Sequence, residues 1–515
     1  MGRYIFSIDV GTQSIKGVIF DFKGRVVYRE KKFYEKPYLS SKPGYSERDP
    51  EEYWNDLVSV CKKVLSYGVN PKDIEAVSVT TQRATTVFLD ENFKPLRNAI
   101  LWLDQRMVEN VPTLGLYEIL FKLAGALRAV RFFQKRSSVN WVREHEPEIW
   151  EKIKHICFLS TFLNYKLTDA FKDSYASQVG YLPFDFKNKR WEPEGSWKYR
   201  AIPVSFDMLP KLVKPSAVLG YITESASNIT GLSKGTPVIA SASDKACELI
   251  GVGACSKYDA SLSFGTTATI NFNSNKYIEA FRFSPAYPSA IENAFNIEYQ
   301  IFRGFWLISW FKEQFAKLES KTAESLGVAT EELLEERVSS IPAGSEGLIL
   351  HPFWSQSVIN KKQEMKGSII GFTDRHKMEH VYKSLIEGLM FALKEGKEAI
   401  EGKIGIRLKH LFASGGGAKS NLVVSCAADI MNLPVFKPNN VETSSLGAAM
   451  LAALGVGKFN SIYEAIDKMK PDGEFIYPNA ESARVYDDIF RKVFVTVKGK
   501  LSPFYEIVDE IFLVK

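Results

Sequence analysis

Two short segments of the chain, about half its length apart, carry serine, glycine and threonine at the same spacing. They are residues 7–14 and 261–268, and each separates two apolar stretches, as the turn of a β-hairpin does. Glycine lets the backbone approach a ligand closely, and successive N–H groups beside a threonine hydroxyl form a concave anion site. Two such turns suggest two related domains that bind one polyphosphate from opposite sides. Only the first turn contains a carboxylate, Asp9, as a metal–nucleotide complex would require.

A hairpin turn built from aspartate, glycine and threonine is common, so Asp9-Val10-Gly11-Thr12 alone is weak evidence of a binding site. The second copy at Gly265-Thr266 favours binding, because ordinary hairpins do not repeat in register across domains. A third candidate, Gly415-Gly416-Gly417, lies between a predicted strand and a predicted helix, where backbone N–H groups can meet a phosphate. It has neither the spacing of a dinucleotide site nor that of a P-loop, and a flexible loop is the alternative.

Asp244 is the sharpest single candidate for chemistry. It follows an apolar strand in the segment Val238–Ala246 and begins a helix of small residues that runs through Gly251 and Gly253. Such an aspartate can simply cap the helix. The alternative is a general base, since phosphoryl transfer needs a group that aligns the acceptor hydroxyl and accepts its proton. We expect a helix N-terminus to keep Asp244 ionised for this role.

Two polar clusters follow strand-like stretches in the first half of the chain, at residues 81–83 and 102–106. Each hydroxyl of a polyhydroxy ligand can donate to a carboxylate and accept from an arginine or glutamine, and an aromatic face suits the ring or chain of such a ligand. The alternative is a surface salt-bridge cluster over a partly buried tryptophan. The candidate substrate-binding residues are Gln82, Arg83, Trp102, Asp104 and Arg106.

Alternating and helical hydrophobic patterns predict the elements that position these residues. The first half shows three strands, a helix and a further strand, which predicts an α/β domain with a mixed sheet. The predicted ranges are strands 4–10, 15–21, 25–33 and 73–80 and a helix over 49–67. The second half repeats this scheme, with strands 260–264, 268–272, 297–302 and 410–413 and helices 305–318 and 380–401. The segment 443–449 begins a helix of small residues, for which close packing is the commoner explanation.

The length of 515 residues exceeds what one hydrophobic core usually supports, so at least two domains are expected. We place the boundary near residue 250, with an N-terminal domain at 1–250 that binds the acceptor and a C-terminal domain at 251–515 that binds the nucleotide. The net charge of +6 is spread along the chain, which argues against nucleic-acid binding. No stretch is apolar enough for a membrane span, and five scattered cysteines fit a reduced, cytoplasmic compartment.

Taken in chain order, these motifs resemble those of the FGGY family of carbohydrate kinases, within the superfamily of actin, hexokinase and Hsp70. The resemblance covers almost the whole chain and five motifs in order. It implies an α/β fold of two ribonuclease H-like, actin-like ATPase domains, whose mixed sheets are flanked by helices, with a cleft between them. The implied cofactors are ATP and Mg²⁺, and the implied acceptor is a small sugar or polyol.

The resemblance also implies roles for particular residues. Asp244 matches the catalytic base of the family and Asp9 its metal-binding carboxylate, direct or through water. The nucleotide would be bound by Gly11, Thr12, Gln13, Ser14 and Lys16 in the first motif, by Gly265, Thr266 and Thr267 in the second, and by Gly415, Gly416, Gly417, Ala418 and Asn421 in the third.

Departures from the family pattern concern the acceptor. Glycerol kinases have a glutamate after the Gln-Arg pair, whereas Ala84 follows Arg83 here, and xylulokinases have a histidine in this region, whereas Thr80–Thr86 contains none. The segment 127–136 is unusually basic, and the stretch Ser355–Asn360 differs from the family's usual residues. We therefore predict ATP-dependent phosphorylation of a ketose, sugar acid or polyol, similar to xylulokinase or ribulokinase. The alternatives are a glycerol kinase with an altered pocket and a non-catalytic, nucleotide-gated regulatory protein. A homodimer is expected from the resemblance alone.

Overall fold

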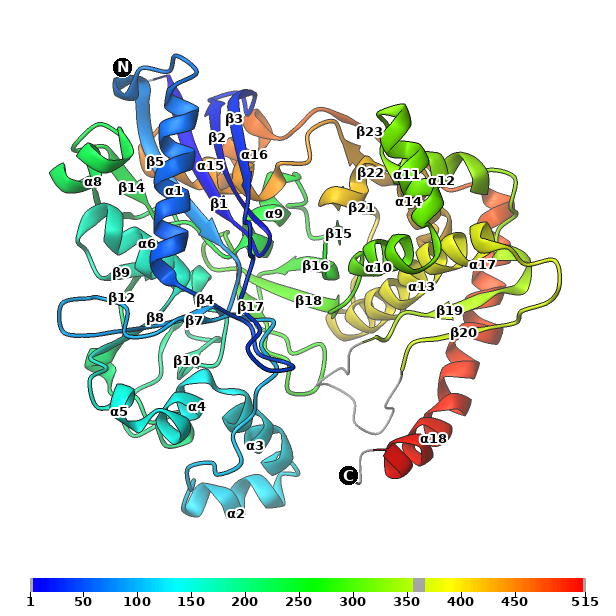
Figure 1. Cartoon of the computed structure of the whole chain (residues 1–515), viewed down its shortest axis with the longest axis horizontal. Helices are drawn as coiled ribbons and strands as arrows, with labels where there is room; N and C mark the ends of the chain where they lie inside the picture. Colours follow the sequence, from blue (N-terminus) through cyan, green and yellow to red (C-terminus); the bar gives the residue numbers. More distant parts are fainter. Residues whose placement is uncertain (1–2, 355–365, 513–515) are drawn as a thin grey trace.

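The computed structural model describes residues 3–354 and 366–512, so the departure at 355–360 lies outside the described residues. Figure 1 shows two large β-sheets with helices around them, the first near the N-terminus and the second built from the later half of the chain. The predicted α/β class with mixed sheets is confirmed. The predicted strands are all present, within about two residues of their predicted ends.

Within the described residues, the first sheet has six strands in the order β13-β14-β5-β1-β2-β3. β1 and β2 form an antiparallel hairpin, β3 extends it, and β5 and β14 run parallel to β1. Residues of β1 and β5 are buried almost without alternation, as expected for strands covered on both faces. The strands are β1 Tyr4–Val10, β2 Ser14–Asp21, β3 Val26–Phe33, β5 Ile74–Thr81, β13 Val218–Tyr221 and β14 Pro237–Ile239.

The second sheet repeats this plan, with seven described strands in the order β17-β18-β16-β15-β21-β22-β23. β15 and β16 form an antiparallel hairpin, β18 extends it, and β21 and β22 run parallel to β15. The common order explains why the two glycine turns occupy equivalent places. The strands are β15 Asp259–Phe264, β16 Ala268–Ser274, β17 Tyr287–Pro288, β18 Phe295–Ile301, β21 His410–Ser414, β22 Val435–Pro438 and β23 Gly473–Ile476.

Helix α1 (Pro50–Leu65) crosses from β3 to β5 and packs on the first sheet. Its start is specified locally, because Asp49 accepts a hydrogen bond from the N–H of Glu51 and Pro50 occupies the first helical position. Helix α13 (Met378–Ile404) occupies the equivalent crossover in the second sheet. The predicted helix 305–318 ends earlier, at Phe315, because Ala316 leaves the helical conformation and α11 starts at Lys317.

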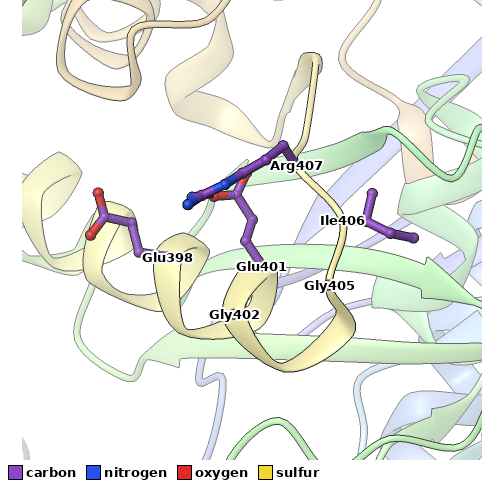
Figure 2. Close-up of a pocket in the computed structure, with 6 residues that line it drawn as sticks. All are labelled: Glu398, Glu401, Gly402, Gly405, Ile406 and Arg407. Atoms are coloured by element: carbon purple, nitrogen blue, oxygen red, sulfur yellow. Dashed lines mark hydrogen bonds and ion pairs between the residues drawn. The ribbon is translucent and has the colours of Figure 1, made fainter.

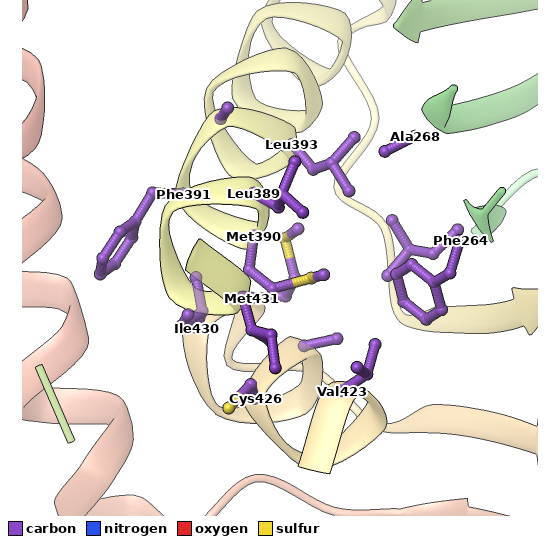
Figure 3. Close-up of a cluster of buried hydrophobic side chains, with 14 of the residues drawn as sticks. Phe264, Ala268, Leu389, Met390, Phe391, Leu393, Val423, Cys426, Ile430 and Met431 are labelled. Carbon is purple, nitrogen blue, oxygen red and sulfur yellow. The ribbon is translucent and has the colours of Figure 1, made fainter. Parts of the chain in front are cut away.

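Helix α13 and helix α14 (Asn421–Met431) carry the core of the second sheet. Figure 3 shows Leu393 of α13 on the side of Phe264 and Ala268, which flank the turn of the β15–β16 hairpin, whereas Phe391 points to the other side of the helix. Cys426 belongs to this core, and burial raises its pKa to about 12, so it is an apolar packing residue. The packing supports the hairpin that carries the second glycine turn.

Two helices of small residues, α9 (Asp244–Gly251) and α15 (Thr443–Gly455), cross each other at close range. A Cβ added to Gly251 would overlap the carbonyl oxygen of Thr443, and one added to Gly447 would overlap that of Cys247. The two contacts are equivalent, because Thr443 lies four positions before Gly447 and Cys247 lies four positions before Gly251. Close packing, the commoner explanation for segment 443–449, is therefore confirmed. Helix α15 also packs on β1 and β5, so a late segment of the chain covers the first sheet.

Gly251→Val is expected to lower the free energy of unfolding by about 1–3 kcal/mol, because the helix backbones cannot separate without loosening the core. The matched control is Gly402→Ala in α13, where an added Cβ meets no atom within 4 Å and where alanine favours helix. Urea unfolding measures both variants. Native stability of Gly251→Val would show that the crossing tolerates a larger separation.

The remaining strands form smaller sheets that are separate from the two large ones. Among the described residues, one of these sheets has four strands, β4 Glu47–Arg48, β6 Thr86–Leu89, β7 Ala99–Ile100 and β8 His155–Phe158. Three further strand pairs are β9 Lys172–Ser174 with β12 Lys211–Val213, β10 Phe184–Asp185 with β11 Arg190–Trp191, and β19 Ile349–His351 with β20 Ser368–Ile370. The other helices are α2 Leu116–Leu123, α3 Leu127–Arg136, α4 Ser138–His145, α5 Pro147–Trp150, α6 Leu159–Thr168, α7 Trp197–Ala201, α8 Glu224–Thr230, α10 Trp306–Phe315, α11 Lys317–Leu326, α12 Thr330–Val338, α16 Ile462–Met469, α17 Ala480–Ile489 and α18 Val495–Phe512. No helix of the described part has both the length and the apolar character that a membrane crossing requires.

Candidate active site

The parallel strands of each sheet end at one edge, and the predicted site residues follow those ends. In the first sheet, Asp9 lies near the end of β1, Gln82 and Arg83 follow β5, and Asp244 follows β14. Ligands of open α/β sheets bind at the carboxyl ends of the strands. The hydroxyl of Thr80 donates to the carbonyl of Ala242 over 2.9 Å, which ties the end of β5 to the segment before Asp244. The sheet therefore brings together residues that lie more than 200 positions apart in the sequence.

The first glycine turn is joined directly to the predicted acceptor residues. The N–H of Gly11 donates to the carbonyl of Ser14 over 3.0 Å, which closes the turn, while Gln13 is exposed at its tip. The hydroxyl of Thr12 donates to Oε1 of Gln82 over 2.7 Å and accepts from Nε1 of Trp102 over 2.9 Å. A phosphate-binding turn and a sugar-binding cluster thus share one hydrogen-bond chain.

The second and third glycine segments touch each other. Gly415 has a positive φ of 76°, and a Cβ added there would lie 3.0 Å from the carbonyl carbon of Phe264 and 3.2 Å from the nitrogen of Gly265. Both loops follow neighbouring parallel strands, β15 and β21. Only glycine permits this approach of two backbones. An added Cβ at Gly416 meets no atom within 4 Å, so this side of the loop is open to a ligand.

The other residues predicted for the nucleotide have distinct environments. Thr266 is exposed, whereas the hydroxyl of Thr267 donates to the carbonyl of Phe302 over 3.2 Å and holds the hairpin to β18. Ala418 is buried, and Gly417 lies against Phe264 and Phe305. Asn421 begins α14, and its side-chain oxygen accepts from Lys437.

Asp9 lies in an acidic corner that a buried glutamate shares. Lys16 on β2 lies 3.4 Å from Oδ2 of Asp9 and 2.9 Å from Oε2 of Glu442. Burial acts against the charged lysine, yet the two carboxylates outweigh it and raise the pKa of Lys16. Burial raises the pKa of Asp9, and Lys16 opposes that shift. The long Lys16 contact is the one polar partner of the Asp9 side chain among the described residues, which leaves carboxylate oxygen free for a cation.

Asp244 is the first residue of α9, and its Oδ1 accepts from the N–H of Lys245 over 2.8 Å. The helix cap is the preceding residue, Ser243. Burial raises the pKa of Asp244, and the positive charges of Arg83 and Lys245 oppose this. The charge of Asp9 raises that pKa further, so the two carboxylates act on one site. Burial thus counters the ionising effect that we expected from the helix N-terminus and makes the carboxylate more basic.

Arg83 joins the two sheets. Its guanidinium binds both carboxylate oxygens of Glu298, on β18 of the second sheet, over 2.9 and 3.1 Å. Its Nε lies 3.8 Å from Oδ1 of Asp244, and its plane lies near the ring of Tyr287. Gln300 donates a further hydrogen bond to Glu298 over 2.6 Å. Arg83 is therefore held beside Asp244 by a carboxylate from the opposite sheet.

Asp104 and Arg106 are brought together but are bound to protein groups. Asp104 accepts from the guanidinium of Arg106 over 2.8 Å and from the N–H of Ser46 over 2.7 Å. Arg106 also pairs with Glu47 over 2.7 Å and lies between the rings of Tyr45 and Trp141. Both side chains are buried. The two residues therefore form a salt bridge, as the alternative interpretation predicted, but inside the protein and not on its surface. Their contact with an acceptor stays a prediction.

Several residues of this site belong to no motif that the sequence analysis identified. Tyr53 accepts from Nε2 of Gln82 over 2.9 Å, Glu442 holds Lys16, and Glu298 holds Arg83. A further pair, Lys245 and Glu248, joins α9 to the second sheet. Nζ of Lys245 donates to Ser263 over 2.6 Å, and Glu248 accepts from Ser414 over 2.8 Å. The only early signal was the position of Lys245 and Glu248 on the helix that begins with Asp244.

The pocket in Figure 2 lies elsewhere, at the C-terminal end of α13. Glu401 there accepts from the N–H of Leu408 over 2.8 Å and from Arg407 over 2.9 Å. These two hydrogen bonds hold the segment after α13 against the side chain of Glu401. None of the residues predicted for the active site lines this pocket.

Two family models match successive parts of the chain. Residues 4–251 match the N-terminal domain of the FGGY family of carbohydrate kinases, and residues 260–456 match the C-terminal domain of that family. A xylulose kinase from Bacillus subtilis is 28% identical over 493 residues, which cover 95% of each chain. A glycerol kinase from Saccharolobus islandicus is 29% identical over 495 residues, which cover 94% of each chain.

Solved structures share the fold. A ligand-bound xylulose kinase from Lactobacillus acidophilus has a TM-score of 0.81 at 21% identity, covering 97% of this chain and 98% of that one. A glycerol kinase from Plasmodium falciparum, solved with ADP, has a TM-score of 0.75 at 21% identity, covering 96% and 98%. The two-domain actin-like ATPase fold implied by the motifs is therefore confirmed. The chain belongs to the FGGY family of carbohydrate kinases and is a carbohydrate kinase.

Proposed function

We propose that this enzyme transfers the γ-phosphoryl group of ATP to a hydroxyl of a small ketose, with Asp244 as the general base. The observation that carries the proposal is the placement of Asp244 beside Arg83, at the carboxyl ends of the first sheet, while Arg83 reaches Glu298 in the second. Kinases of this family use ATP. The contact between Gly415 and the Phe264–Gly265 backbone supports a nucleotide site on the second sheet.

The residues present fit a nucleotide with a divalent cation. Asp9 offers a buried carboxylate with one long protein contact, and the open face at Gly416 leaves room beside the second glycine turn. Asp9 would hold Mg²⁺, directly or through water, and the ion would neutralise charge on the phosphates. Backbone N–H groups of Gly11–Thr12 and Gly265–Thr266 would bind the phosphate oxygens. Asp244 would orient the acceptor hydroxyl and accept its proton as the new O–P bond forms.

The acceptor side favours a ketose over glycerol. Arg83 at the end of β5 offers a guanidinium and Trp102 beside Thr12 offers an aromatic face, while the amide of Gln82 is bound to Thr12 and Tyr53. Ala84 adopts a positive φ of 54° and has no carboxylate to bind glycerol hydroxyls. Xylulose kinases and glycerol kinases both align over nearly the whole chain, so the preference rests on the pocket residues.

The test is ADP formation with a panel of pentuloses, hexuloses, aldonates, polyols and glycerol. We expect kcat/KM to be highest for one of the ketoses and turnover with glycerol to be near background. Preferred turnover of glycerol would identify a glycerol kinase with a rebuilt pocket. ATP hydrolysis that no sugar stimulates would support a nucleotide-gated regulatory role instead.

The pH dependence of kcat/KM for the sugar is expected to report Asp244. A general base must be ionised, and burial raises the pKa of this carboxyl. Activity should therefore fall on acidification through a pKa above the ordinary aspartate value of about 3.9. Steady-state kinetics between about pH 4 and pH 8 measure the profile. An acid limb at or below the ordinary value would contradict the assignment of Asp244 as the base.

A further inference from the structure

A partly buried lysine next to the proposed base reaches the second glycine turn. Lys245 is the second residue of α9, a helix that contacts β5 of the first sheet and β15 and β16 of the second (Figure 1). Its Nζ donates to the hydroxyl of Ser263 over 2.6 Å. That hydroxyl oxygen lies 3.9 Å from the position of a Cβ added to Gly265. The side chain of Lys245 therefore leads from the helix that begins with Asp244 to the turn assigned to the phosphates.

Glu248, on the next turn of the same helix, holds the ammonium of Lys245 in place. Its carboxylate lies 3.2 Å from Nζ of Lys245 and accepts from the hydroxyl of Ser414 over 2.8 Å. Ser414 directly precedes Gly415 and is paired with Ser263 across the parallel strands β21 and β15. The lysine and the glutamate are thus anchored at the ends of both strands that carry the glycine loops of the second sheet.

The first hairpin has a lysine in the equivalent place. Asp9 and Ser263 each lie two positions before the glycine of their turn. Across its hairpin Asp9 is paired with Lys16, whereas Ser263 is paired with Thr269. The register of β16 thus offers a threonine where β2 offers a lysine, and the ammonium beside Ser263 comes from α9 instead. Both glycine turns consequently have an ammonium group beside them, from Lys16 and from Lys245.

The ammonium of Lys245 can bind a further group. Lysine has three N–H donors, and Ser263 and the Glu248 carboxylate are the partners found among the described residues. One N–H therefore remains for a ligand, and the side chain is 14% exposed. The charge of Lys245 opposes the burial that raises the pKa of Asp244. The charge of Glu248 raises the pKa of Asp9, so the pair lies within electrostatic range of both active-site carboxylates.

We propose that Lys245 binds the γ-phosphoryl group of ATP and that Glu248 positions it. This inference rests on the proposed function, which places the acceptor hydroxyl at Asp244, the residue before Lys245. The γ-phosphoryl group is the part of ATP that meets this hydroxyl, and an ammonium beside it would neutralise charge during transfer. The alternative is a structural ion pair that only ties α9 to β15 and β21. The two interpretations differ in what they predict for nucleotides with and without a third phosphate.

Calorimetry without sugar separates the two interpretations. The probes are the magnesium complexes of ADP and of the β,γ-imido analogue of ATP, which resists hydrolysis. Lys245→Met with Glu248→Gln removes both charges and leaves no unpaired carboxylate. It should raise Kd for the triphosphate analogue by about 10- to 150-fold, the usual effect of losing a hydrogen bond between charged groups. Kd for ADP should stay within about twofold, since ADP lacks the phosphate concerned and the pair is neutral as a whole.

Two further variants accompany the double variant. Lys245→Met alone leaves Glu248 unpaired beside the phosphates, so it should weaken binding of the triphosphate analogue at least as much. The matched control is Lys397→Met with Glu401→Gln, which removes a lysine–glutamate pair of similar burial from α13. This control should keep the native ratio of the two dissociation constants. Native ADP binding by the Lys245 variants shows that their site is folded.

The other outcomes would overturn the inference. Native affinity for both nucleotides, or an equal loss of both, would show that the pair is structural. A raised KM for the sugar with native binding of the triphosphate analogue would assign Lys245 to the acceptor. Failure of the proposed function is read from different measurements, because it appears in the native enzyme, as absent binding of the analogue, or in the sugar panel. Absent binding by the native enzyme would overturn the nucleotide site and this inference together.

Discussion

Asp244→Asn is expected to lower kcat by about 10²- to 10⁴-fold, the usual contribution of a general base. The amide keeps the size of the side chain but cannot accept the proton of the acceptor hydroxyl. The dissociation constant for ATP should remain within about twofold, because the proposed nucleotide site lies on the glycine turns. Loss of one solvent-screened charge outside that site should change ATP binding little. Coupled ADP formation measures kcat, and calorimetry without sugar measures ATP binding.

The stability of this variant is a second readout. Burial raises the folded-state pKa of Asp244 above its unfolded value, so its ionised form lowers stability above the unfolded pKa. That loss is relieved as pH falls through the folded pKa. Asp244→Asn removes this partly exposed charge and should be at least as stable as the native enzyme at neutral pH. The matched control is Asp259→Asn, a buried aspartate paired with His410 on the second sheet, which should keep kcat. Native turnover by Asp244→Asn would remove Asp244 from the role of base.

The glycine turns and the hairpins were predictable because their signals are local. Asp9 and Gly11 lie in one tight turn between apolar strands, and Gly265 repeats the pattern. The cap of α1 is similarly specified by Asp49 and Pro50, which adjoin the helix. Structures fixed by residues a few positions apart leave a readable pattern in a single sequence.

The partners of the site residues could not be predicted, because they come from distant segments. Glu298 lies 215 positions from Arg83, and nothing in its strand marks it as different from other polar residues on β18. Glu442 reaches Lys16 from the start of α15 in the same way. Folding places these carboxylates where they compensate buried charge, and that requirement is visible only in three dimensions.

The contact between the late helix α15 and the first sheet was also not predictable from the sequence. A boundary near residue 250 stays a prediction, and the structure adds that α15 packs on β1 and β5 of the first sheet. The small residues of α9 and α15 indicated close packing but not which helix each would meet. The need for glycine at positions 251 and 447 is visible only where α9 and α15 cross, because an added Cβ there would overlap the other helix.

Arg83→Met is expected to lower the free energy of unfolding by about 3–5 kcal/mol, the usual loss when one partner of a buried ion pair is removed. The side chain of Glu298 is 2% exposed and, among the described residues, would keep only the amide of Gln300 as a partner. Arg83→Met with Glu298→Leu removes both charges and should recover most of that stability. Urea unfolding of the two single variants and the double variant measures the cycle.

The same cycle separates the structural role of Arg83 from its role in binding. A hydrogen bond to a charged group contributes about 1.5–3 kcal/mol, so loss of a guanidinium that binds the sugar should lower kcat/KM by about 10- to 150-fold. The double variant should therefore recover stability without recovering kcat/KM. Recovery of both would mean that Arg83 only neutralises Glu298. Recovery of neither stability nor kcat/KM would mean that the ion pair itself holds the two sheets in the arrangement that transfers phosphate.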